Sequence, residues 1–548
     1  MVASSALLLA LGTSLTFFGD SWAFLLQRDG STADLLLRPH NEHIVVLPVA
    51  LQELAVEWFG TGSDMPSRVL LTAMLSGTAI LLFVHVRRRV GAWPALFSAA
   101  ILLFLGSGWE NLLWPFQISL VGSMLAGLAS LLALERADRR GDLAACGLLT
   151  VSIASSSLGV SFAVGAVADL LLRRRDRGVG RAWIAAIPLL LYGAWYVAYG
   201  RDAESAASLA NLLTAPLFVV ESVTASAASL LGLRALAGGI DAGAPVVAMI
   251  VVGALFVALI AWMWRRGPQT WRPLLRRGPA SPLWPIAATA LSFWFLAALN
   301  EAPGRSPFAS RYMYIGAVLL ILLAANILAG VRIGRRGLAV MGAVAAVAVG
   351  LNTHLLLEGH DRLRRESVLT RANLGALEIA EPTVASSFWL DPGIAGTSSL
   401  INVTAGPYLD LVGEHGSPAY RPDELIDAPE AGRRQADVVL AHALRVTLTR
   451  HGAAAMPRTV AKAGRCVTLT VERVEVPLGA GLTAIRPAGG ATTLVLHRFA
   501  PPGVNPIILG ELSGASVARL RLPRDGSSRP WYLGAVPPGG VRVCSESR

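Results

Sequence analysis

Two acidic residues early in the chain have the side chain needed for a general base. Asp20 lies two residues after the end of the apolar run Val2 to Phe18, and Glu42 lies in the polar stretch that follows. A carboxylate beside an apolar run can remove a proton from a sugar hydroxyl or position a metal ion. The alternative is an ordinary solvated residue at a membrane boundary, next to an interfacial tryptophan, Trp22.

Glu42 belongs to a dense polar motif, Arg38-Pro39-His40-Asn41-Glu42-His43. His40 and His43 are three residues apart, so a helix would place them on one face. Together with Glu42 or Asp20 they can bind a divalent metal ion, the one cofactor that the sequence suggests. A polar loop with a capping asparagine explains the same residues without a ligand.

Aromatic and amide side chains form a third cluster. Trp109, Glu110 and Asn111 are followed closely by Gln117. Aromatic rings with acid and amide groups suit sugar stacking and hydroxyl recognition, which predicts contacts with a sugar or acceptor here and at Trp22. An aromatic belt at the membrane interface explains the tryptophans equally well, but not Glu110, Asn111 and Gln117 together.

A fourth cluster contains Arg305, Arg311 and Tyr312. The guanidinium group binds phosphate through two parallel hydrogen bonds. These arginines, with Tyr312 and the Arg38, His40 and His43 motif, are the predicted donor-phosphate contacts. The alternative is a pair of surface arginines that balance Glu301.

The elements that carry these residues must lie in a membrane. The chain has 548 residues, of which 54% are hydrophobic and 15% charged, and its mean hydropathy is +0.55. Soluble domains carry about 25% charged residues. Uncharged runs such as Gly243 to Trp264 match the roughly 20 residues that cross about 30 Å of hydrocarbon. The sequence therefore predicts a protein embedded in the lipid bilayer.

We expect an all-α polytopic membrane domain over residues 1–357, with about eleven transmembrane helices. The region 143–172 is either one long tilted helix or two short spans broken near Ser155 to Gly159, and the placement of arginines favours two. After Val2 to Phe18, the expected spans are Arg68–Val86, Ala92–Gly106, Pro115–Leu134, Leu143–Ser157, Gly159–Leu172, Ala182–Tyr199, Gly243–Trp264, Pro282–Leu299, Tyr312–Gly330 and Leu338–Leu357.

The net charge of +11 follows the positive-inside pattern and does not indicate nucleic-acid binding. Arginines gather in short loops between the spans, which predicts a cytoplasmic N-terminus and an extracytoplasmic C-terminal domain. Lys462 is the only lysine, and this bias suggests a bacterial plasma membrane. The arginine-rich loops are Arg87–Arg89, Arg136–Arg140, Arg173–Arg181, Arg265–Arg277 and Arg332–Arg336.

Two apolar stretches are expected at the outer interface and not across the membrane. The long outer first loop, residues 19–67, contains Ile44 to Phe59, whose acids Glu53 and Glu57 would each cost about 2.5–3.5 kcal/mol at mid-bilayer. Arg201 to Asp241 is rich in alanine and serine and is likewise expected to form interfacial helices.

Residues 358–548 are expected to form a soluble extracytoplasmic domain, β-sandwich-like in its second half. Cys466 and Cys544 lie in this region and are predicted to form a disulfide, with two unrelated buried thiols as the alternative. Short strands separated by turn signals are predicted at Cys466–Val474, Thr492–Phe499, Ser516–Leu522 and Val541–Cys544.

This layout resembles the GT-C class of membrane glycosyltransferases, which includes protein mannosyltransferases, aminoarabinose transferases and mycobacterial arabinosyltransferases. The likeness covers residues 1–357 by architecture, and by motif only the first outer loop. The resemblance implies that the donor is a polyprenyl-phosphate sugar and that an acidic residue of the first outer loop is the base. Asp20 occupies the position of that acid, and Glu42 is a second acid in the same loop. Ser21 stands where many members have another acid, which leaves the base open.

The leading hypothesis is transfer of a sugar to a glycan or protein acceptor of the cell envelope, and the sequence has no P-loop and no dinucleotide-binding glycine motif. One alternative is a transporter or flippase for a lipid-linked or polar substrate, which would place polar groups near the membrane midplane. Another is a non-catalytic envelope protein that displays a carbohydrate-binding domain.

Overall fold

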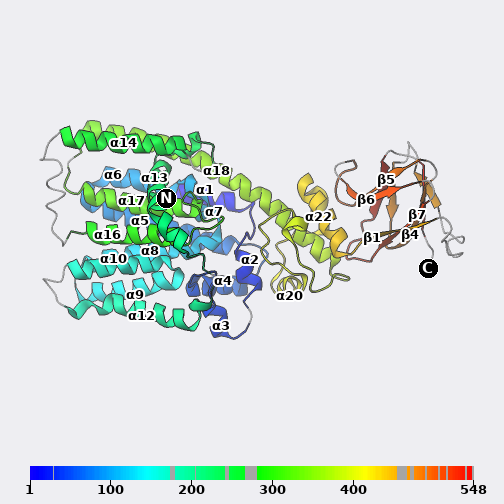
Figure 1. The fold of residues 1–548 in the computed structure, drawn as a ribbon, viewed down its shortest axis with the longest axis horizontal. Helices are drawn as coiled ribbons and strands as arrows, with labels where there is room; N and C mark the ends of the chain where they lie inside the picture. Colours follow the sequence, from blue (N-terminus) through cyan, green and yellow to red (C-terminus); the bar gives the residue numbers. More distant parts are fainter. Residues whose placement is uncertain are drawn as a thin grey trace. The chain divides into compact units, whose positions relative to one another are not determined.

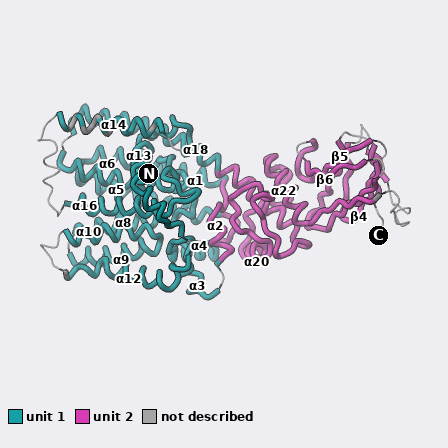
Figure 2. Tube along the Cα trace, viewed as in Figure 1, with its two compact units in different colours: residues 1–14, 28–58, 64–362 teal, residues 15–27, 59–63, 363–548 magenta. Residues whose placement is uncertain are grey.

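The computed structural model divides the chain into two compact units (Figure 2). Unit 1 comprises Met1–Ser14, Arg28–Trp58 and Asp64–Arg362, and unit 2 comprises Leu15–Gln27, Phe59–Ser63 and Leu363–Arg548. The structure describes all residues except 29, 137, 173–178, 204, 241–245, 266–280, 332, 453–465, 470–473, 488–489, 504–505, 514–515, 537–539 and 546–548.

Unit 1 is a bundle of apolar helices (Figure 1). An α-helix satisfies its own backbone hydrogen bonds, which is why uncharged runs of this length take helical form in a bilayer. The helices are α1 (Val2–Gly12), α3 (Thr32–Leu37), α4 (Val46–Phe59), α5 (Met65–Val90), α6 (Ala92–Leu103), α7 (Trp109–Leu113), α8 (Ile118–Leu134), α9 (Arg139–Ser155), α10 (Leu158–Leu172), α12 (Trp183–Ala198), α13 (Leu209–Leu230), α14 (Val246–Arg265), α16 (Leu283–Leu299), α17 (Ser310–Ile327) and α18 (Arg335–Ala380), with 3₁₀ turns at η1 (Gly106–Gly108), η2 (Pro115–Gln117), η3 (Val179–Arg181), η4 (Gly200–Asp202) and η5 (Leu233–Leu236).

Each predicted span corresponds to a helix, although the count of about eleven crossings stays a prediction. Among the described residues, five helices are long and apolar enough to cross a membrane, or six if α6 and the bent segment after it form one span. The arginines of 173–178, 266–277 and 332 lie outside the described residues. The five are Met65–Val90, Pro115–Leu134, Leu209–Leu230, Ser310–Ile327 and Arg335–Ala380.

The region 143–172 contains two helices, as the arginine pattern favoured. The backbone at Ser156 is extended, so α9 stops there and α10 begins two residues later. Gly159 allows the two to approach closely, because a Cβ at this position would lie 2.4 Å from the Ile153 nitrogen.

Helix α13 is long and apolar enough to cross a membrane, and residues at or near both of its ends are hydrogen-bonded to the segment between α16 and α17. Near its start, Asn211 donates to the carbonyls of Leu299 and Glu301, both at 3.0 Å. Just beyond its end, Arg234 is buried and donates to the Phe308 carbonyl at 2.9 Å. Both ends of α13 are thus tied to the 299–308 segment. The interfacial arrangement expected for residues 201–241 stays a prediction, because this helix also meets the length and apolarity of a membrane span.

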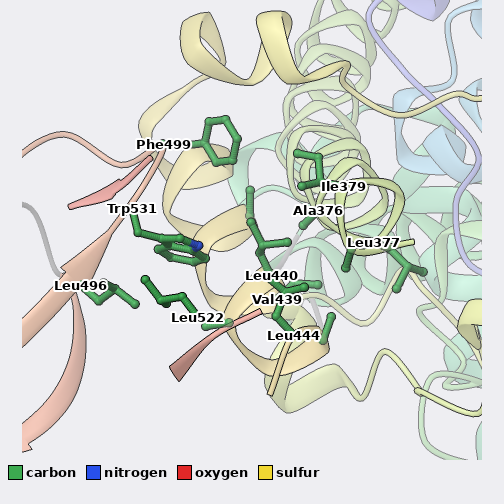
Figure 3. Packing of buried hydrophobic residues seen from close by; sticks show 14 of the residues in the cluster. Ala376, Leu377, Ile379, Val439, Leu440, Leu444, Leu496, Phe499, Leu522 and Trp531 are labelled. Atoms are coloured by element: carbon green, nitrogen blue, oxygen red, sulfur yellow. The ribbon is translucent and has the colours of Figure 1, made fainter. Parts of the chain in front are cut away.

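Unit 2 has a helical part and a sheet part that share one hydrophobic core. The last turns of α18 and the amphipathic helix α22 (Glu430–Ala443) pack against apolar residues of the sheets, among them Phe499 and Trp531 (Figure 3). The other helices are α2 (Ser21–Leu26), α19 (Pro392–Ala395), α20 (Ala405–His415) and α21 (Pro422–Asp427).

The sheet part is a pair of antiparallel sheets, which matches the predicted sandwich. The four predicted strands are present as β2, β5, β7 and β9, and the others were not predicted. One sheet has the order β1-β7-β4-β9-β2 and the other β3-β8-β5-β6. The strands are β1 (Thr447–Gly452), β2 (Cys466–Leu469), β3 (Glu475–Leu478), β4 (Gly481–Pro487), β5 (Thr492–His497), β6 (Ile507–Leu512), β7 (Ser516–Leu522), β8 (Trp531–Val536) and β9 (Val541–Ser545).

A buried carboxylate joins α22 to the sheets. Asp437 accepts hydrogen bonds from the backbone N–H groups of three successive residues, Arg498 to Ala500, at 2.8 to 3.0 Å. Burial raises the pKa of Asp437, and these three donors act in the opposite direction. The Arg498 guanidinium is paired in turn with Asp525, at 2.7 Å. Each buried charge therefore has compensating partners, as a close-packed core requires.

The boundary between the units differs from the predicted break at residue 357. Helix α18 continues without interruption to Ala380, and unit 2 also includes Leu15–Gln27 and Phe59–Ser63 from the first loop. The apolar run ends near Leu357, but a polar sequence with good helix formers extends the same helix. Hydropathy located the end of the apolar segment and not the end of the helix.

A disulfide joins Cys466 and Cys544, which are directly opposed on strands β2 and β9, while Cys146 is a buried free thiol in α9. We expect that, after denaturation without reductant, an alkylating label modifies one cysteine per chain, and after reduction three. In the Cys146→Ala variant the unreduced count should fall to zero. Two further labelled cysteines without reductant would contradict the bridge, which on a chain-entropy basis stabilises by about 4 kcal/mol.

Candidate functional site

The motif that contains Glu42 is a tight turn. His40 and His43 exchange two backbone hydrogen bonds, each 3.0 Å long, and Asn41 takes the left-handed conformation with φ of 50°. Asparagine tolerates this region better than most residues. The turn places Glu42 at its tip, between α3 and α4. The expectation that a helix would align His40 and His43 is therefore wrong, because the two residues face each other across a turn.

Glu42 is paired with Arg305, a residue more than 260 positions further along the chain. The Arg305 Nη1 donates to the Glu42 Oε1 at 2.8 Å, and both side chains are largely buried. The His43 Nε2 lies 3.4 Å from the same oxygen. This ion pair joins the first loop to the loop between α16 and α17.

A second acid–arginine pair stands at the start of α17. Glu110 Oε2 accepts the backbone N–H of Arg311 at 3.1 Å, and the Glu110 N–H donates to the Ser310 Oγ at 3.2 Å. This reciprocal pattern resembles a capping box made between two helices. The Arg311 guanidinium donates to the Gly304 carbonyl at 3.1 Å. Glu110 therefore caps α17 and fixes the backbone that carries Arg311, a role that the sequence did not suggest.

We call Glu42, His43, Arg305 and Arg311 the Glu42 cluster. Burial lowers the pKa of His43, with Glu42 opposing this shift and Arg305 and Arg311 adding to it. His43 is thus neutral at pH 7, and the charge of the cluster is that of two guanidiniums and one carboxylate. Tyr312 lies within electrostatic range of both arginines and of Glu42.

Polar atoms in the Glu42 cluster lack hydrogen-bond partners. Among the described residues, Glu42 Oε2, His43 Nδ1 and Arg311 Nε are buried and make no hydrogen bond. Arg311 Nε is 3.7 Å from Glu110 Oε2, which is too long for one. Buried polar atoms are nearly always satisfied, so three exceptions in one place indicate a site that a polar ligand or water completes.

The predicted sugar contacts of the aromatic segment have structural roles. Asn111 and Gln117 are fully buried and hydrogen-bonded to each other at 3.3 Å. Trp109 is 7% exposed and packs where a Cβ at Gly359 would lie 2.5 Å from its ring. These side chains hold α7 in the bundle, and their burial leaves them no exposed face for the predicted sugar contact. A row of rings remains beside the turn, in which Phe116 contacts His40 at 5.2 Å.

Asp20 and Trp22 belong to unit 2. Trp22 is 1% exposed and sits edge-on to Phe17 and Tyr408 in the hydrophobic core, so its ring is not placed to stack on a sugar. Asp20 precedes α2, next to Gly19, whose N–H donates to the Ser399 carbonyl at 2.9 Å. That Asp20 acts as the base, and that it shares a cavity with Glu42 and Arg311, stays a prediction.

Arg38 lies at the end of α3 and is exposed. Its carbonyl accepts from Arg28 Nη1 at 3.0 Å. Burial, followed by repulsion from Arg38, lowers the pKa of Arg28 to about 10. Arg38 therefore supports the loop through its carbonyl, and its predicted contact with the donor phosphate stays a prediction.

The residues of the turn do not suit a divalent cation. In the part of the chain that the structure describes, no group of three or more His, Cys, Asp or Glu side chains is arranged to hold a metal ion. Glu42 Oε1 is already held by the Arg305 guanidinium, so a positive charge stands beside this carboxylate. A second positive charge at this position would be repelled, so we derive no step through a metal.

No protein-family model and no curated protein matches the chain. Among solved structures it is similar to ArnT from Cupriavidus metallidurans bound to undecaprenyl phosphate, at 12% sequence identity, a TM-score of 0.44, and coverage of 85% of this chain and 95% of that chain. It is also similar to the arabinosyltransferase EmbB from Mycobacterium smegmatis, at 13% identity, a TM-score of 0.32, and coverage of 100% of this chain and 64% of that chain.

The Glu42–Arg305 pair should show measurable coupling in a double-mutant cycle of Glu42→Gln and Arg305→Gln. We expect about 1 kcal/mol in the free energy of unfolding, because the pair is only partly solvent-exposed. The matched control is the exposed pair Arg201–Asp202, with atoms 3.7 Å apart, which should show no coupling. Equal results for the two pairs would contradict the arrangement described here.

Proposed function

We propose that the protein is a membrane glycosyltransferase that moves a sugar from a polyprenyl-phosphate donor to a glycan or protein acceptor on the extracytoplasmic side. The observation that carries the proposal is the Glu42 cluster, in which a carboxylate with one unpartnered oxygen stands beside two arginines. Such a transfer needs a carboxylate that accepts a proton and a cation that stabilises the negative charge of the departing phosphate.

The proposed reaction is an inverting displacement. The acceptor hydroxyl loses its proton to a carboxylate and its oxygen forms a new bond to the anomeric carbon. The bond between that carbon and the donor's phosphate oxygen breaks, and the phosphate leaves with the electron pair. A lipid phosphate is already a workable leaving group, so nucleotide chemistry is not required.

Each member of the Glu42 cluster has a role in this step. Arg311 binds the departing phosphate, since its Nε is unsatisfied in the structure and its backbone is fixed by Glu110. Arg305 donates to Glu42 Oε1 and holds this carboxylate in place beside the proposed phosphate site. Glu42 Oε2 accepts the acceptor's proton. Asp20 is the second candidate base, on the sequence argument alone.

The outward side follows from the arginine pattern. The cluster stands at the ends of helices opposite to Arg87–Arg89 and Arg136–Arg140, which the positive-inside rule places in the cytoplasm. Polyprenyl-linked sugars are used on the extracytoplasmic side by enzymes of the class that the sequence resembles. The proposed localisation is therefore a bacterial plasma membrane with the Glu42 cluster outside.

Substitution should separate the two candidate bases. We expect Arg311→Gln to lower transfer by about 10²-fold and Glu42→Gln by about 10²–10⁴-fold, with unchanged amounts of folded protein in the membrane. Arg201→Gln, which changes an exposed arginine, is the control and should be neutral. If Asp20→Asn abolishes transfer while Glu42→Gln is active, Asp20 is the base. If both acid variants transfer normally, the proposed mechanism is wrong.

Reporter fusions test the orientation. Alkaline phosphatase joined after Arg548 should be active, because that enzyme folds only outside the cytoplasm, and a green fluorescent protein at the same point should be dark. A fluorescent fusion with inactive phosphatase would place the sheets of unit 2 in the cytoplasm and reject an extracytoplasmic acceptor.

A further inference from the structure

A second polar region lies at the other end of α17. Arg311 is in the first turn of this helix and Asn326 in its last, and fifteen residues at 1.5 Å each separate them by about 22 Å. Around Asn326 lie the last turn of α5, which carries Arg88 and Arg89, and the end of α8 at Glu135. The proposed transfer reaction uses none of these residues.

An open cavity of about 520 Å³ is present at this end of unit 1. Its lining includes Arg88, Arg89, Glu135, Ser281 and Asn326. Two guanidiniums face one carboxylate, so these side chains carry a net positive charge. A cavity of this size accommodates a small polar group such as a lipid headgroup.

Arg89 lines the cavity, and three interactions hold its side chain in place. It donates to Asn326 Oδ1 at 2.8 Å and to the His85 carbonyl at 3.2 Å, and it forms an ion pair with Glu135. Arg88 precedes Arg89 in the same helical turn. It is exposed and makes no ion pair within the described part of the chain. Arg88 is therefore the charge that remains available to a ligand.

Ser281 adds a hydroxyl donor. Its Oγ accepts the Leu283 N–H at 3.4 Å, a bond that uses a lone pair and leaves the hydroxyl hydrogen available. Guanidinium and hydroxyl donors that line the same cavity match the several acceptor oxygens of a phosphate group.

His85 provides a further donor in an adjoining small cavity. Asn326 Nδ2 lies 3.0 Å from His85 Nε2 and, because Arg89 occupies the amide oxygen, it must donate to that nitrogen. The ring proton is then on Nδ1, which is buried and has no hydrogen-bond partner among the described residues. His85 is 2% exposed and, with Glu135 and Asp169, lines a cavity of about 20 Å³, enough for one water molecule.

We propose that the Arg88 cavity binds the phosphate group of an anionic lipid. The adjoining cavity points to a lipid, because Leu128, Leu131 and Ile286 line it together with the polar residues. Helices α5 and α17 are both long and apolar enough to span a bilayer, so the cavity opens at the depth of headgroups. Arginines at such helix ends are where anionic lipids gather.

Native mass spectrometry of the full-length protein in phosphatidylcholine nanodiscs with added phosphatidylglycerol tests this proposal. We expect one tightly held phosphatidylglycerol per chain, and Arg88→Gln to weaken its binding about tenfold, as the loss of a charge-assisted contact predicts. Arg87→Gln is the matched control, because Arg87 is exposed in the same helical turn but does not line the cavity. This control should change binding less than about twofold.

A second arm uses inorganic phosphate without the added lipid. Arg88-dependent binding of phosphate that displaces phosphatidylglycerol would also support the cavity as a phosphate site, with a soluble ligand as its occupant. If neither probe binds at a ratio of one per chain, or if Arg87→Gln and Arg88→Gln have equal effects, the proposal is overturned. The outcome is independent of sugar transfer, because no residue of the Glu42 cluster is altered.

Discussion

The structure of unit 1 depends on the difficulty of keeping charge among apolar helices. A charged side chain in such surroundings must be paired or must reach water. Arg68 and Asp64 show the rule, since both are buried and two hydrogen bonds of 2.8 and 2.6 Å join them. Polar and charged groups gather at both ends of helix α17, around Arg311 at one and around Asn326, with Arg89 and His85, at the other. The atoms left unsatisfied at these ends are the ones available to ligands.

The residue types of the candidate site could be predicted, but their partners could not. Glu42, Arg305 and Arg311 were identified because acids and arginines beside apolar runs are unusual. That Glu42 would pair with Arg305 depends on how α16, α17 and the first loop pack, and no local pattern contains that information. The predicted sugar contact of Trp109 does not match its burial, because the local sequence around a tryptophan that packs in a bundle looks like that around one that stacks on a sugar. His85 was missed because a single histidine in an apolar run usually packs as a core residue.

Helix positions followed from hydrophobic periodicity and run length, which act locally. The end of α18 did not, because helix propensity continues where hydropathy stops. In unit 2 the predicted strand Thr492–His497 contains three β-branched residues, Thr492, Thr493 and Val495, whereas Trp531–Val536 is interrupted by Gly534 and takes its strand form from pairing with β3 and β5. Cross-strand pairing between distant segments is the part of the fold that a single sequence specifies least.

Equilibrium binding of a polyprenyl phosphate to the purified protein tests most directly whether the Glu42 cluster is a phosphate site. Arg311 should provide affinity, whereas Glu42 should act on the acceptor. The account predicts that Arg311→Gln weakens binding at least about tenfold, while Glu42→Gln, although inactive in transfer, binds the lipid at least as tightly as the unchanged protein. Wild-type affinity in the Arg311→Gln protein would contradict it.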